Sequence, residues 1–276
     1  MSSGPQQINV AEVVAKRLPR HSKFIPRFVT RGLERLICQD RLNELLRNVH
    51  PAQGSEAASG YLKEMGISVK VSGEENIPAS GRFLFASNHP LGGLDGLALI
   101  SLLGNRYDGR IKFIVNDLLM AVEPLKSVFL PVNKYGAQSR ERVNEIEAEY
   151  AGDKQMITFP AGLCSRRQPD GKIHDLEWKK SVITLAVNYQ RDIVPIYFDE
   201  ANSSWFYRIA DWRKRLGMKF NAEMILLPRE MIKKENSTLH VVFGPLIPHT
   251  SLDAARPREE AQRLCDVVYG LKPSSK

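Results

Sequence analysis

Short hydrophobic runs alternate with helical patterns along most of the chain beyond residue 60. Six runs predict strands, at residues 68–71, 82–86, 112–115, 155–159, 193–197 and 239–243. Between them, hydrophobic residues recur at helical spacing in residues 96–103, 140–150 and 179–190. Alternation of strands with helices predicts an α/β fold, in which a mostly parallel sheet is flanked by helices.

The first sixty residues follow a different pattern. Leucine and isoleucine recur at helical spacing up to residue 49, in segments interrupted by Pro19 and Pro26. Residues 50–60, HPAQGSEAASG, are rich in small and turn-forming residues and predict a linker or loop. We therefore expect a helical N-terminal extension at 1–60, an α/β domain at 61–250, and a C-terminal helix and tail at 251–276.

Composition excludes several classes of protein. A chain of 276 residues with 43% hydrophobic residues can bury a sizeable core, so a disordered tail, a collagen and a small disulfide scaffold are excluded. The longest apolar stretch, LALISLL at residues 97–103, is far shorter than the roughly 18 residues that span a bilayer. No transmembrane helix is expected, and the first residues do not resemble a signal peptide, which predicts a cytoplasmic location.

The net positive charge indicates an acidic binding partner but does not identify which kind. Lys and Arg number 39 and Asp and Glu number 31, which gives a net charge of +8. This excess predicts attraction to nucleic acid, an anionic membrane surface or a phosphorylated substrate. Cys38, Cys164 and Cys265 lie far apart and in no metal-ligand spacing, so they are expected to be free thiols.

The most informative segment is FLFASNHPLGGLDGL, at residues 83–97. A short apolar strand leads into a loop that carries Asn88 and His89, and a helical pattern follows Asp95. Because Asp is a favoured N-cap, we expect the helix to begin just after Asp95. A carboxylate that holds one imidazole nitrogen leaves the other able to remove a proton, so His89 and Asp95 are a candidate dyad. In the alternative interpretation, both residues only cap a turn and a helix.

A second segment, MITFPAGLCSRR at residues 156–167, also joins a strand to a polar loop. Gly162 permits close approach of the backbone, and the guanidiniums of Arg166 and Arg167 suit carboxylate or phosphate oxygens. A surface turn with solvated arginines is the alternative. Cys164 has no visible base dedicated to it, and no Gly-x-Ser-x-Gly motif is present.

Together these segments resemble the glycerolipid acyltransferase superfamily, which includes 1-acyl-glycerol-3-phosphate acyltransferases, from about residue 61 to 248. The first block of that family, Asn-His with a downstream Asp, matches Asn88, His89 and Asp95. The third block, Phe-Pro-Glu-Gly-Thr-Arg-Ser, is matched approximately at residues 159–166, and the fourth at 194–196. The blocks also follow in the family's order and spacing.

The resemblance implies transfer of a fatty acyl group from a thioester, carried by acyl carrier protein or coenzyme A, to a hydroxyl of a lysolipid. His89 would be the general base and Asp95 its orienting partner, with no cofactor and no acyl-enzyme. Negative charge develops on the carbonyl oxygen of the thioester during the reaction. This oxyanion would be stabilised by Asn88, Ser165 and backbone amides near Gly92 or Gly162. The full set of expected substrate contacts is Asn88, Gly92, Gly93, Lys134, Gly162, Ser165, Arg166 and Arg167.

Lys134 enters this set from the second block of the family, which supplies a basic residue from a loop after a strand. The corresponding region is EPLKSVFLPVNK, at residues 123–134. Lys126 and Asn133 are the other candidates there. Solvated loop residues without a role in binding are the alternative.

The chain departs from the family pattern in two places, and the second bears on the acceptor. Residues 90–94 place five positions between His89 and Asp95 where the family usually has four, and two glycines would let this loop fold back. Ala161 replaces the glutamate of the third block, in a region that the family associates with the acceptor.

The blocks also resemble a bacterial hemolysin-like subgroup that includes O-acyltransferases for amino-acid-containing lipids. An ornithine- or glycine-containing lysolipid is therefore an alternative acceptor, and a non-catalytic lipid-binding protein is an alternative function.

Residues 171–180, GKIHDLEWKK, lie between the third and fourth blocks. His174 and Asp175 could suggest a second acid/base pair, but adjacent residues point in different directions, which favours a surface turn. Trp178, with Lys179 and Lys180, is a candidate for lining the site.

A membrane-facing element is predicted at residues 204–220. On a helix, Trp205, Trp212 and Leu216 share one side with Ile209, beside basic residues, as at a bilayer interface. Packing of that side on the sheet is the alternative. The basic N-terminal extension is a second candidate, and no nucleic-acid motif is present, so no nucleic acid is expected. The sequence thus predicts an enzyme of phospholipid biosynthesis, peripheral to the inner face of the cell membrane.

Overall fold

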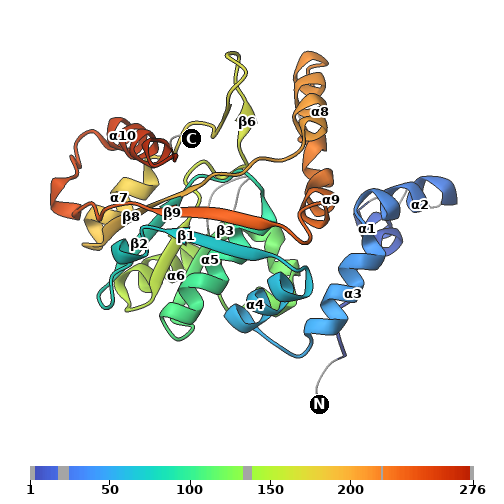
Figure 1. Ribbon diagram of the computed structural model, residues 1–276, viewed down its shortest axis with the longest axis horizontal. Coiled ribbons are helices and arrows are strands. Elements are labelled where there is room, and N and C mark those ends of the chain that lie inside the picture. Colours follow the sequence, from blue (N-terminus) through green and yellow to red (C-terminus); the bar gives the residue numbers. More distant parts are fainter. Residues whose placement is uncertain (1–3, 18–24, 133–138, 219, 274–276) are drawn as a thin grey trace.

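The computed structural model describes residues 4–17, 25–132, 139–218 and 220–273. A seven-stranded sheet, ordered β1-β9-β8-β2-β5-β3-β4, lies at its centre with helices on both faces (Figure 1). Its strands are β1 (Ser68–Ser72), β2 (Phe83–Ser87), β3 (Ile111–Asn116), β4 (Phe129–Val132), β5 (Gln155–Thr158), β8 (Asp192–Phe198) and β9 (Thr238–Phe243). The short strands β6 (Arg166–Arg167) and β7 (Ile173–His174) form a separate hairpin. The predicted α/β class is confirmed.

Five neighbouring strands, in the order β8-β2-β5-β3-β4, run parallel. Strand β9 is antiparallel to β8, and β1 is parallel to β9. The carboxyl ends of the five parallel strands therefore lie at one edge of the sheet, where α/β proteins bind ligands. Because β2 and β5 are adjacent, the loops that follow them, from Asn88 and from Phe159, are brought together at this edge.

The helices are α1 (Val10–Arg17), α2 (Arg27–Leu36), α3 (Gln39–Val49), α4 (Gly54–Glu64), α5 (Gly93–Arg106), α6 (Arg140–Ala151), α7 (Ser181–Asn188), α8 (Ser204–Arg215), α9 (Leu227–Ile232) and α10 (Pro257–Gly270). Alternate residues of β2 enter two cores: Phe83 and Phe85 pack with α4 and α5, and Leu84 and Ala86 pack with α7 and α10. No helix among the described residues is long and apolar enough to cross a membrane.

Residues 50–60 are largely helical, whereas the sequence predicted a linker or loop. Helix α4 begins at Gly54 and packs closely on α5: a Cβ added at Gly104 would lie 2.2 Å from Cβ of Ser55. The Oγ atoms of Ser59 and Ser101 lie 2.8 Å apart across the same contact. Small residues here serve helix packing rather than a turn. Helix α4 crosses the boundary predicted at residue 60, and the division into three parts stays a prediction.

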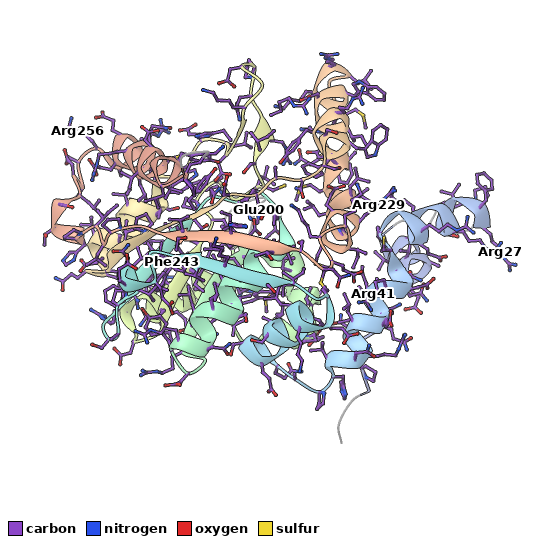
Figure 2. The ribbon with its side chains drawn as sticks, in the orientation of Figure 1. Arg27, Arg41, Glu200, Arg229, Phe243 and Arg256 are labelled. Atoms are coloured by element: carbon purple, nitrogen blue, oxygen red, sulfur yellow. The ribbon has the colours of Figure 1, made fainter. Side chains whose placement is uncertain are left out.

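The predicted N-terminal helices are attached to the body through α3. Its buried side consists of Leu42, Leu45, Leu46 and Val49. Arg41 on the same helix pairs with Glu235, with 2.7 Å between Nε and Oε1. Figure 2 shows Arg41 beside the body and Arg27 at the far end of α2, away from the strand that carries Phe243.

Helix α8 projects from the body next to the β6–β7 hairpin (Figure 1). It packs inward through Phe206, Tyr207 and Ala210. Its other side carries Trp205, Trp212 and Leu216, which are 46%, 56% and 74% exposed. These three residues belong to the apolar side that the sequence singled out, whereas its fourth member, Ile209, is half-buried and packs against the cluster that contains Phe206 and Tyr207.

Candidate active site

His89 lies in the loop after β2, and its ring meets Asp95 in the first turn of α5. Nδ1 of His89 and Oδ2 of Asp95 are 3.0 Å apart. Gly92, with a φ of 82°, turns the chain back into the helix. Only glycine adopts that conformation readily, which explains how a loop of five residues still brings the pair together.

Asp95 is held rigidly, although not as the N-cap that the sequence predicted. Helix α5 begins at Gly93, with Gly92 as its N-cap, so Asp95 belongs to the first turn. Its side chain is fully buried, and its two oxygens accept hydrogen bonds from the amides of Leu91, at 3.0 Å, and Gly96, at 2.9 Å. These N–H groups and the helix N-terminus stabilise a carboxylate at this position.

One nitrogen of the His89 ring is occupied and the other is available. A carboxylate can only accept, so Nδ1 carries the proton that it donates to Asp95, and Nε2 is left as an acceptor. The ring stacks on Phe159 from the β5 loop, with 3.9 Å between centroids, and its side chain is 16% exposed. No residue in the described ranges hydrogen-bonds to Nε2. This nitrogen is placed to take a proton from a hydroxyl that approaches it.

Asp175 lies in the interior of the site, and the predicted surface turn is wrong for this residue. It is 4% exposed and follows β7. Its Oδ1 accepts hydrogen bonds from Ser165 Oγ, at 2.6 Å, and from the His89 amide, at 3.2 Å. Trp178, which the sequence placed near the site, donates from Nε1 to Oδ2 at 3.0 Å. Burial raises the pKa of the Asp175 carboxyl, and the hydrogen bond from Ser165 opposes that effect. The Trp three residues after Asp175 was the one signal of burial in the sequence.

Asn88 joins two strands. Its Oδ1 accepts from the Phe198 amide at 2.7 Å, and its Nδ2 donates to the Phe198 carbonyl at 3.0 Å. The residue is 2% exposed. Both ends of the amide are therefore committed to the backbone of β8, which ties the start of the His89 loop to the neighbouring strand.

Arg166 does not offer the free guanidinium that the sequence predicted. It is 2% exposed and pairs with the fully buried Glu223, with 2.8 Å between Nη2 and Oε1. Its Nη1 donates to the Cys164 carbonyl at 2.6 Å. Glu223 also pairs with Arg213 of α8, at 2.9 Å. Arg166 thus anchors α8 and the segment around Glu223 to the third block, and its charge is neutralised inside the protein.

Two other cations remain near the β5 loop. The Arg167 side chain is 34% exposed, and its Nη1 lies 3.7 Å from Oδ2 of Asp211. Gly162, with a φ of 67°, leaves room for Lys179, because an added Cβ would lie 3.0 Å from its Nζ. Gly93 opens onto free space, with nothing within 4 Å of an added Cβ. Lys134 falls outside the described residues.

The three cysteines are free thiols, as predicted. Cys164 is fully buried, and this burial raises the pKa of its thiol to about 11. A thiol that stays protonated at neutral pH is a poor nucleophile. In the described part of the chain, no group of three or more His, Cys, Asp or Glu side chains could hold a metal ion.

We expect the Cys164→Ala variant to keep its catalytic rate within about threefold of that of the parent, because the buried thiol is not ionised. Steady-state kinetics of the purified variant measures this. Cys164→Ser serves as a second variant that keeps the volume. Loss of more than about 100-fold in both folded variants would instead assign Cys164 a covalent role.

Comparison with known proteins places the chain in a family. The sequence model of a family described as Acyltransferase matches residues 12–275. A lyso-glycine lipid O-acyltransferase of Bacteroides thetaiotaomicron is 42% identical over 265 residues, covering 96% of this chain and 97% of that protein. A protein of the same name from Phocaeicola vulgatus is 41% identical, covering 96% of this chain and 95% of that protein.

Among solved structures, a 1-acyl-sn-glycerophosphate acyltransferase from Thermotoga maritima matches with a TM-score of 0.48 and 16% identity. The match covers 96% of this chain and 99% of that one. The family match extends over nearly all of the described chain, including both loops that meet at His89. The chain belongs to the acyltransferase family.

Proposed function

We propose that this acyltransferase moves a fatty acyl group from a thioester of acyl carrier protein or coenzyme A to a hydroxyl of a glycine-containing lysolipid. The observation that carries the proposal is the His89–Asp95 pair, in which Nδ1 is held at 3.0 Å from a buried carboxylate and Nε2 remains available. The acceptor is taken from the two relatives, which are lyso-glycine lipid O-acyltransferases.

In the proposed reaction, Nε2 of His89 takes the proton of the acceptor hydroxyl while its oxygen attacks the thioester carbonyl carbon. Asp95 stabilises the imidazolium that forms. The carbon–sulfur bond then breaks, and His89 returns the proton to the departing thiolate. The products are an ester and a free thiol, with no cofactor and no acyl-enzyme. Amides at the start of α5, near Gly92 and Gly93, are our candidates for stabilising the oxyanion.

The cations that remain exposed near the site suit a substrate with an anionic group. Arg166, the expected binding residue, is neutralised by Glu223, whereas Arg167 and Lys179 lie beside the β5 loop with accessible charge. We assign these two residues to the carboxylate of the acceptor or a phosphate of the donor. Ala161, where the wider family has glutamate, is consistent with an acceptor other than a glycerol phosphate derivative.

Purified enzyme tests the choice of acceptor. The assay offers lyso-glycine lipid, lyso-ornithine lipid and lysophosphatidate in parallel, each with acyl carrier protein and coenzyme A thioesters, and quantifies both acylated lipid and free fatty acid. We expect lyso-glycine lipid to be acylated at a kcat/KM at least about tenfold above that of lysophosphatidate. Preference for lysophosphatidate would contradict the acceptor, and free fatty acid as the main product would indicate a hydrolase.

We also propose that the enzyme rests on the inner face of the cell membrane through α8. The exposed side chains of Trp205, Trp212 and Leu216 form an apolar surface on this projecting helix, and Met218 and Phe220 just beyond it are 46% and 65% exposed. The last turn of α8 also carries Lys214 and Arg215, which are exposed. Aromatic rings beside cations suit the interface of an anionic bilayer.

Vesicle binding tests this surface. We expect Trp205→Ala combined with Trp212→Ala to weaken binding to phosphatidylglycerol-containing vesicles at least about tenfold, because burial of a large apolar side chain contributes roughly 1.5–3 kcal/mol. Leu246→Ala is the control, since Leu246 is also exposed, at 38%, but lies outside α8. Sedimentation with vesicles measures both variants. Equal binding by the double variant and the parent would rule out α8 as the contact.

A further inference from the structure

Every backbone polar group of His89 is fixed by the loops around it, and Asp175 holds one of them. The His89 carbonyl accepts from the Ser165 amide at 2.7 Å. The His89 amide donates to Oδ1 of Asp175 at 3.2 Å, and the Ser165 hydroxyl donates to the same oxygen at 2.6 Å. Residues 89, 165 and 175 therefore form a closed set of hydrogen bonds behind the imidazole.

Asp175 is itself held from two further elements. Its Oδ2 accepts from Nε1 of Trp178, just before α7, and its own amide donates to the hydroxyl of Tyr269 on α10 at 2.7 Å. Trp178 is 2% exposed, so this anchor is inside the protein. A buried carboxylate with three donors aimed at its oxygens has one stable orientation.

We propose that Asp175 is a positioning residue for catalysis, which fixes the backbone of His89 so that Nε2 stays aimed at the acceptor hydroxyl. The proposal rests on the proposed function. Asp95 holds the His89 ring by a hydrogen bond to Nδ1, and Phe159 stacks on the face of the ring. Asp175 holds the backbone amide of His89. Displacement of a catalytic group by about 1 Å is enough to lower a rate about 100-fold.

The arrangement makes a specific prediction for three variants. Asp175→Ala removes all the acceptors, so we expect kcat to fall about 100-fold with KM for both substrates within about twofold. Asp175→Asn keeps one acceptor oxygen but turns an amide toward the N–H of Trp178, and we expect a loss of about tenfold. Adding Trp178→Phe to Asp175→Asn removes the opposing donor, so the double variant recovers part of that loss.

Steady-state kinetics with lyso-glycine lipid and an acyl thioester measures kcat and KM separately for each variant. Asp170→Ala is the matched control, because Asp170 lies on the same hairpin but is exposed, and its carboxylate contacts Lys172. We expect the control to match the parent. An unchanged kcat in Asp175→Ala, or a loss confined to KM, would overturn the proposal. If Asp175→Ala does not fold, Asp175→Asn carries the test, and a kcat equal to that of the parent in this variant would overturn the proposal equally.

A second measurement does not depend on the substrate. Hydrogen exchange of the His89 amide, followed by NMR, is expected to be at least about tenfold faster in Asp175→Ala than in the parent, because the acceptor of that amide is gone. Unchanged exchange in Asp175→Ala would contradict the proposed contact.

An inactive parent enzyme would refute the proposed function alone, whereas an active parent with full activity in Asp175→Ala would refute the positioning role alone.

Discussion

Replacing His89 with alanine is expected to lower kcat by about 10³-fold or more, the largest effect of any single substitution in this chain. General base catalysis contributes roughly 10²–10⁴-fold, and the described residues include no second imidazole beside Asp95 that could replace His89. The ring stacks on Phe159 and hydrogen-bonds to Asp95, whereas the loop is held through the backbone of His89, so the variant should remain folded. Steady-state kinetics together with thermal unfolding separates lost chemistry from lost structure.

The chain contains a matched control for this variant. His249 and Asp192 form a second His–Asp pair, with 2.7 Å between Nδ1 and Oδ1. Asp192 begins β8, so this pair lies at the amino edge of the parallel strands, opposite the candidate site. We expect His249→Ala to keep activity within about twofold. Near-normal turnover by folded His89→Ala would refute the role of His89 as the base.

Asp95→Asn is expected to lower kcat about 10²–10³-fold. The carboxylate accepts the Nδ1 proton of His89, whereas an asparagine amide can donate to Nδ1 and would leave the proton on Nε2, where it blocks proton removal. The same change weakens the bonds from the Leu91 and Gly96 amides, which hold the side chain in place.

Kinetics of Asp95→Asn and Asp192→Asn, measured side by side, test this prediction. The second substitution alters the other His–Asp pair and should leave kcat within about twofold. Circular dichroism in the near ultraviolet shows whether the packing of each variant is intact. A folded Asp95→Asn enzyme with the parental kcat would mean that Asp95 has only a structural role.

Much of the fold follows from patterns that are local in the sequence. Six predicted strands and three predicted helices of the α/β domain are present within a few residues of their expected ends. The segment at 50–60 could not be predicted correctly, because its small residues resemble a turn and their value for packing appears only when α5 lies against them. Ala57 and Ala58 are fully buried in that contact.

In the site, too, the sequence predicts contacts between residues that are close in the chain but not those between distant residues. His89 and Asp95 are close in the sequence, and the motif around them predicts their contact. Asp175 lies 86 residues from His89, and Glu223 lies 57 residues from Arg166, so no local pattern predicts either contact, although Trp178 indicates burial near Asp175. An aspartate in a polar turn and an arginine in a glycine-containing loop look solvated until the fold supplies a partner. The sequence therefore predicted the dyad but misjudged the residues that support it.

Lipid profiling of cells that carry, lack or regain the gene tests the proposed function most directly. Without the gene, we expect lyso-glycine lipid to accumulate and its O-acylated product to disappear. Return of the parent gene should reverse both changes, and return of a gene encoding His89→Ala, at equal protein level, should reverse neither. Restoration of the acylated lipid by His89→Ala would contradict the proposed mechanism, and an unchanged glycine lipid profile without the gene would contradict the proposed acceptor.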